Sequence, residues 1–71
     1  MGIGIIIKLT ENSLKVCQDI ARKDPNFKFK IDDKNKRILI FAKNMSDAYK
    51  KGYWLKYKAS CGNFYIVEVV E

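Results

Sequence analysis

Apolar residues along this chain recur with spacings that alternate between those of strands and helices. The run Ile3–Leu9 is rich in β-branched residues and predicts a buried strand. From Glu11 to about Lys23, apolar residues recur every three or four positions, which predicts a helix capped by Thr10. Pro25 disfavours helical backbone at Asp24, so we expect this helix to end there.

A hairpin is predicted next. Phe27–Asp32 alternates strictly between apolar and charged residues, as in a strand with one buried face. The polar segment Asp33–Lys36 predicts a turn, and Arg37–Ala42 predicts the partner strand. With Lys34 and Asn35 at the turn, the core face comprises Phe27, Phe29, Ile31, Ile38, Ile40 and Ala42. The opposite face comprises Lys28, Lys30, Arg37, Leu39 and Phe41.

A second helix is predicted from Asn44 or Ser46 to about Ser60. Its apolar stripe comprises Met45, Ala48, Gly52, Leu55 and Ala59. After the break at Cys61–Asn63, the segment Phe64–Val70 predicts a last strand. The order strand, helix, strand, strand, helix, strand is that of the α+β ferredoxin-like fold, βαββαβ. We therefore expect a four-stranded antiparallel sheet with both helices on one face and the other face open.

Composition narrows the functional classes. The 71 residues suffice for a single compact domain, residues 1–71, and 48% of them are hydrophobic. Histidine is absent, which removes the commonest general base and metal ligand. Cys17 and Cys61 are too few for a disulfide framework or a zinc site, and we expect free thiols. We therefore expect no enzyme activity, no metal and no cofactor.

The charge balance favours an anionic partner. Lys and Arg outnumber Asp and Glu by 14 to 8, which gives a formal net charge of +6. Nucleic acid is the first candidate, although lysine also serves as an ordinary solvating residue. No apolar run approaches the ~18 residues of a membrane span, and the N-terminal segment lacks the features of a signal peptide. We expect a cytoplasmic protein with no membrane partner.

Three chemistries known for this topology are not supported. Metal-transfer domains need a Cys-x-x-Cys pair, and acylphosphatases need a phosphate-cradling loop with an arginine, after the first strand. That loop is Lys8–Asn12 here and supplies neither. The RNA-recognition motif places a basic and aromatic pattern on its third strand, and only Arg37 and Phe41 fit it. Ile6 also stands where the first strand would offer a stacking ring.

The open sheet face remains a candidate binding surface. Lys28, Lys30 and Arg37 could pair with phosphates beside Leu39 and Phe41, although an ordinary solvated face would look similar. A self-association face is another reading, because Leu39 and Phe41 would adjoin further apolar residues. We expect those neighbours to be Ile6 and either Phe64 or Ile66.

The second helix is the other candidate surface. Helical spacing turns Trp54 away from the apolar stripe, unless it folds over the helix end into the core. Exposed Trp and Tyr are typical of interface centres. The predicted neighbours of Trp54 are Lys50, Tyr57 and Lys58, with Tyr53 and Tyr49 on the flank.

These features favour a non-catalytic binding protein that engages nucleic acid or a nucleoprotein. The alternative is an inhibitor or adaptor that targets a nucleic-acid-processing protein, similar in kind to the phage-encoded anti-CRISPR proteins that block host defence nucleases. A third hypothesis is a structural homodimer formed through the open sheet face.

Overall fold

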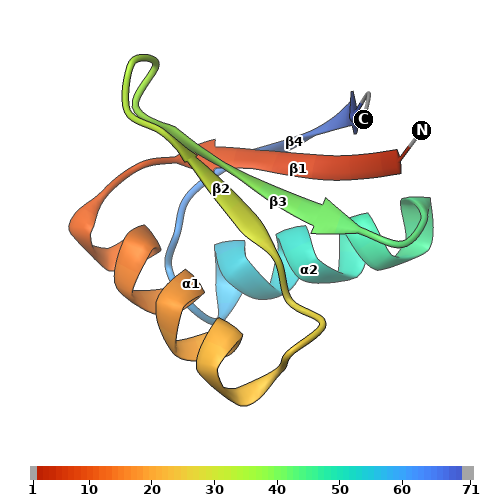
Figure 1. Ribbon diagram of the computed structural model, residues 1–71, viewed down its shortest axis with the longest axis horizontal. Helices are drawn as coiled ribbons and strands as arrows, with labels where there is room; N and C mark the ends of the chain where they lie inside the picture. Colours follow the sequence, from red (N-terminus) through yellow and green to blue (C-terminus); the bar gives the residue numbers. More distant parts are fainter. Residues whose placement is uncertain (1, 70–71) are drawn as a thin grey trace.

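The predicted fold class is confirmed by a computed structural model that describes residues 2–69. Two helices lie on one face of the sheet, and the other face is uncovered (Figure 1). The elements follow the chain as β1 (Gly2–Lys8), α1 (Glu11–Lys23), β2 (Phe29–Asp32), β3 (Arg37–Ala42), α2 (Met45–Tyr57) and β4 (Phe64–Val69). Val70, predicted to close the last strand, lies outside the described residues.

The sheet is four-stranded and antiparallel, with strand order β2-β3-β1-β4. The first and third strands therefore form its centre, as expected for this topology. In the β2–β3 hairpin, Phe29 lies opposite Ile40 and Ile31 opposite Ile38. This register confirms the division of the hairpin into a core face and an open face.

The core lies between the sheet and the helices. Its fully buried side chains come from both central strands and from both helices, among them Ile5, Ile38, Cys17 and Leu55. Phe27 is buried as predicted, although it precedes the first paired residue of β2. Ile31 has the predicted orientation but is exposed, because β2 lies at the sheet edge, where fewer neighbours cover it.

Local capping fixes where α1 begins. The side chain of Thr10 accepts a hydrogen bond from the backbone N–H of Ser13 at 3.0 Å, which confirms Thr10 as the N-cap. The helix ends at Lys23, just before Asp24 and Pro25. The predicted start and end of this helix are both confirmed.

The second helix begins as predicted, with Asn44 as its N-cap, but it ends earlier than predicted. Asn44 caps it by accepting a hydrogen bond from the N–H of Asp47 at 2.8 Å. Met45 was expected in the apolar stripe but is 47% exposed, because the first turn projects beyond the core. The helix ends at Tyr57 and not near Ser60, since Ser60 adopts a left-handed backbone with φ 56°. The N–H of Cys61 then donates to the carbonyl of Leu55 at 2.9 Å and closes the turn.

Candidate binding surfaces

The open sheet face carries a band of apolar side chains bordered by cations. The strand registers place Ile6 between Leu39 on β3 and Tyr65 on β4. Lys30 lies opposite Leu39 on the far side of β3. The hydrogen bond from the N–H of Phe41 to the carbonyl of Lys28, at 3.0 Å, extends this ladder by one pair. The five predicted residues of this face, Lys28, Lys30, Arg37, Leu39 and Phe41, therefore lie on one surface.

One part of this face was predicted wrongly. Phe64 or Ile66 was expected to join the open apolar patch, but both pack against the core cluster. The alternation along β4 puts Tyr65 and Val67 on the open face instead. Tyr65 is 53% exposed, and it is a candidate site residue that sequence reasoning missed.

Arg37 is held in place above this face. Its Nε donates to Asp32 Oδ2 at 3.3 Å, and its Nη1 donates to the Tyr65 hydroxyl at 3.2 Å. Because β3 and β4 lie on opposite sides of β1, the Arg37 side chain spans β1 to reach Tyr65. A guanidinium group has five N–H donors, so three are left without a partner among residues 2–69.

Asp32 and Arg37 each stabilise the charged form of the other. Hydrogen bonds from the side chain and backbone of Asn35 lower the pKa of Asp32, and Arg37 lowers it further. The Tyr65 hydroxyl and Asp32 raise the pKa of Arg37. Asp32 therefore stays ionised and orients a permanently cationic side chain.

A shallow hollow of about 260 Å³ lies beside Arg37 on the same face. Lys30 and Arg37 line this hollow together with apolar side chains. The full lining is Ile6, Lys30, Ile31, Asp32, Arg37 and Leu39. Apolar side chains beside two cations, one of them paired with Asp32, suit a ligand that combines a flat apolar part with a negative charge.

The second helix carries a row of three tyrosines. Rings of Tyr49 and Tyr53 are 6.2 Å apart with 19° between their planes, and those of Tyr53 and Tyr57 are 6.0 Å apart with 11° between them. The Tyr53 ring also packs against Phe64 on β4, at 5.2 Å between ring centres and 85° between their planes. All three tyrosines of this row are exposed, Tyr57 most of all at 67%. Tyr57, predicted near Trp54, stacks on Tyr53 and so completes the row.

Trp54 lies on a different flank of α2. It is 47% exposed, which confirms a surface position, and it lines a groove between the two helices. Two adjoining hollows of about 280 and 310 Å³ share Ile20 and Asp24 of the α1 side with Trp54. Part of the indole therefore rests in this groove, so Trp54 is less exposed than the largely exposed position predicted from helical spacing.

The lysines in and directly after α2 differ in their exposure to solvent. Lys50 and Lys58 are exposed, as predicted. Lys51 is half-buried and donates to Asp47 Oδ2 at 2.9 Å and to the carbonyl of Phe41 at 3.2 Å. It therefore ties α2 to β3.

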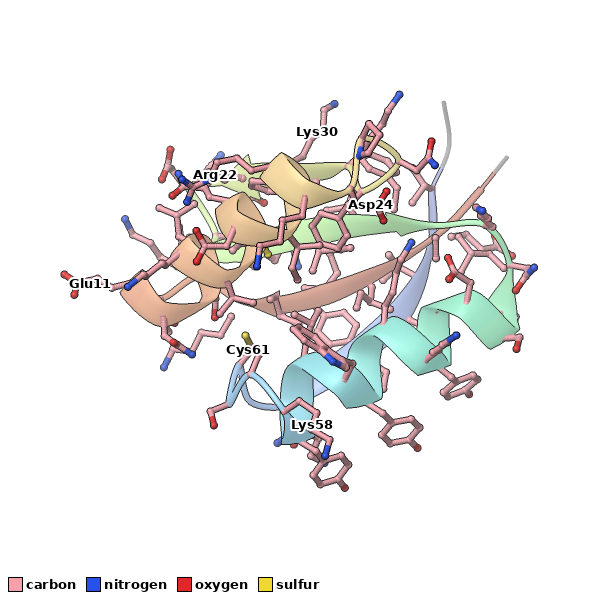
Figure 2. All side chains as sticks on the ribbon, turned by 90° about the horizontal axis from the view of Figure 1, so that it is seen from below. Glu11, Arg22, Asp24, Lys30, Lys58 and Cys61 are labelled. Atoms are coloured by element: carbon pink, nitrogen blue, oxygen red, sulfur yellow. The ribbon has the colours of Figure 1, made fainter. Side chains whose placement is uncertain are left out.

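The ten predicted site residues thus lie on both sides of the sheet. Five lie on the open sheet face, and five lie on α2 or at its C-cap, beneath the opposite face of the sheet. The second five are themselves divided, because Tyr53 and Tyr57 lie on the β4 side of the helix, whereas Lys50 and Trp54 line the groove beside α1. Lys30 and Lys58 mark opposite sides of the molecule (Figure 2). A single flat ligand cannot contact both surfaces at once.

The two cysteines belong to the core. Cys17 and Cys61 are both free thiols and both buried. Burial, with a contribution from nearby Cys61, raises the pKa of Cys17 to about 12. Burial also raises the pKa of Cys61. Neither thiol is a ready nucleophile in this state, because the thiolate is the reactive form.

Among residues 2–69, His, Cys, Asp and Glu nowhere gather in a group of three or more that could hold a metal ion. None of the helices in the described part of the chain is long and apolar enough to cross a membrane.

Comparison with known proteins gives no relative for this chain: no family model, no curated protein and no solved structure matches it. Its function must therefore be inferred from its own surfaces.

Proposed function

We propose that this chain is a non-catalytic binding protein that takes single-stranded nucleic acid on its open sheet face. The observation that carries the proposal is the placement of Arg37 by Asp32 and Tyr65, with Lys30 on the rim of the same hollow. The three Arg37 donors without a partner among residues 2–69, together with the exposed ammonium group of Lys30, suit phosphate oxygens.

The neighbouring side chains suit unpaired bases. Tyr65 is exposed and Phe41 half-buried on this face, and Leu39 and Ile6 lie between the cations. Base stacking on exposed aromatic rings needs no particular sequence, since every base presents a flat face. A strand without a complementary partner can turn its bases toward the sheet, whereas a duplex keeps them stacked inside. The proposal therefore favours single strands over duplexes.

The test is fluorescence anisotropy with labelled single-stranded RNA and DNA of mixed sequence. The variant Lys28→Gln/Lys30→Gln removes two exposed lysines from the open face. The matched control, Lys50→Gln/Lys58→Gln, removes two exposed lysines from α2 and its C-cap and so lowers the net charge equally. We expect the first variant to lose about tenfold or more in affinity and the control to lose much less.

Two outcomes would overturn the proposal. Equal losses in the two variants would mean that binding follows net charge and not the open face. Absence of binding by the wild-type chain to any single strand at low salt would exclude the nucleic-acid function, and a protein-targeting inhibitor or adaptor would become the better hypothesis.

A further inference from the structure

The two edges of the sheet differ in how they are protected. β2 is four residues long and carries Lys30 and Asp32, and short charged edge strands resist pairing with other chains. β4 lies at the other edge, runs for six residues, and has Glu68 as its one charged residue. Its outer backbone groups pair with no strand of this sheet. The edge formed by β4 therefore lacks the protection that β2 has.

We propose that β4 pairs antiparallel with β4 of a second copy, so that two sheets become one continuous sheet. The strand is complementary to itself in this arrangement. With Ile66 opposite the partner's Ile66, Phe64 falls opposite the partner's Glu68, and Tyr65 falls opposite the partner's Val67. Residues opposite each other then belong to the same sheet face, so both helix layers lie on one side.

The tyrosine row of α2, Tyr49, Tyr53 and Tyr57, fits the space that this pairing creates. The contact of Tyr53 with Phe64 shows that the row lies on the β4 side of the helix. Ring side chains project from α2 on the side away from α1 (Figure 2). The pairing would cover these exposed rings, which the monomer leaves in water at an energetic cost.

The sheet topology sets the distance between the two copies of α2 in this dimer. α2 packs against β1, β3 and β4, and β1 is the middle strand of these three. Across the two-fold axis, the two copies of α2 would stand three strand spacings apart, which is about 14 Å. Helices in direct contact are 8–10 Å apart. The extra space holds a layer of large side chains, and the tyrosine rows supply it.

Charge favours a second copy of this chain over an unrelated strand. Gly52 lies against Phe64, and α2 runs antiparallel to β4 (Figure 1). Lys56 is one turn further along α2, so it lies just beyond the Phe64 end of β4. In the proposed register, that end faces the partner's Glu68. Two opposite-charge pairs, Lys56 with the partner's Glu68 and its symmetric equivalent, would therefore flank the two-fold axis.

The dimer would also set two open sheet faces side by side. Formation of the dimer does not depend on nucleic-acid binding, because β4 and the tyrosine row do not line the hollow at Arg37.

The test is the molecular mass by sedimentation equilibrium over a concentration series, without nucleic acid. We expect the wild-type chain to sediment as a dimer. Tyr53→Glu should weaken the dimer by about tenfold or more, because it places two carboxylates in the joined rows. Lys56→Glu and Glu68→Lys should each weaken it, and the double variant should recover it. Lys50→Glu, on the flank that lines the Trp54 groove, is the matched control and should leave the mass unchanged.

A wild-type chain that stays monomeric at every concentration would overturn the proposal. So would a dimer that withstands Tyr53→Glu and Lys56→Glu, because it would have to form through another face. Far-UV circular dichroism of each variant, compared with wild type, separates loss of pairing from loss of fold.

Discussion

The ring of Phe64 occupies the space that a side chain at position 52 would need. A Cβ atom added to Gly52 would overlap the ring of Phe64, so the absence of a side chain lets α2 approach β4 closely. The same ring packs perpendicular to the Tyr53 ring, and it therefore helps to set the direction of the tyrosine row.

Gly52→Ala should therefore destabilise the fold. Alanine improves helix propensity by about 1 kcal/mol, but overpacking of a core contact costs about 1–3 kcal/mol and forces the Phe64 ring to move. We expect a net loss, measured by urea unfolding. Gly2→Ala is the control, since a Cβ at position 2 meets nothing within 4 Å. Combining Gly52→Ala with Phe64→Leu should recover part of the loss, and strict additivity of the two changes would refute the overlap.

Trp54 and Tyr57 should respond differently to truncation. Trp54 is 47% exposed and rests partly in the groove beside Ile20, so Trp54→Ala should cost roughly 1–2 kcal/mol, between the values for exposed and buried side chains. Tyr57 is more exposed, and Tyr57→Ala should cost less than about 0.5 kcal/mol. Thermal unfolding of both variants tests this order. A larger loss for Tyr57→Ala would contradict the packing described for α2.

Asp47 should make stability depend on pH. Hydrogen bonds from the N–H of Lys43 and from Lys51 lower the pKa of this carboxyl below its ordinary value of 3.8. A lowered pKa in the folded state adds stability above the ordinary pKa, and that stability is lost as the pH falls through the folded value. Asp47→Asn should cost about 1 kcal/mol at neutral pH, and the difference from wild type should shrink below pH 3.8. Asp33→Asn, in the exposed hairpin turn, is the control. A difference that does not vary with pH would argue against this role of Asp47.

The alternation of apolar and polar residues was enough to predict the two faces of the hairpin, but it was not enough to predict those of the last strand. Phe27–Asp32 alternates between apolar and charged residues, so its faces and its register with Ile38 and Ile40 were predictable. Phe64–Val69 is apolar on both faces except at Glu68, so nothing in the alternation distinguishes them. The contact of Tyr65 with Arg37 therefore could not be foreseen, since it requires the register of β4 on β1.

In the second helix, the buried face could be predicted from the sequence, but the surroundings of Trp54 could not. Its buried stripe of Ala48, Gly52 and Leu55 was predictable from helical spacing. The four-residue spacing of Tyr49, Tyr53 and Tyr57 is that of a row on one flank, although only Tyr49 and Tyr53 were assigned to that flank from the sequence. The groove that partly covers Trp54 depends on where α1 lies, which the pattern of one helix does not reveal.

The ring of Tyr65 can be tested separately from its hydroxyl. Tyr65→Phe keeps the stacking surface but removes the acceptor of the Arg37 hydrogen bond, and Tyr65→Leu removes both. If a base stacks on this ring, Tyr65→Leu should lose about 1–3 kcal/mol of single-strand binding, and Tyr65→Phe should lose much less. Equal losses in anisotropy titrations would assign the role of Tyr65 to its hydroxyl and not to stacking.

The salt dependence of single-strand binding tests the central claim most directly, because each phosphate contact adds about −0.7 to the slope of log affinity against log salt. Wild-type chain and Lys28→Gln/Lys30→Gln should be titrated with one labelled single strand over a range of salt concentrations. If both lysines contact phosphates, the slope for the variant should be shallower than that of wild type by about 1.4. Identical slopes for the two proteins would show that the open sheet face does not hold the nucleic acid.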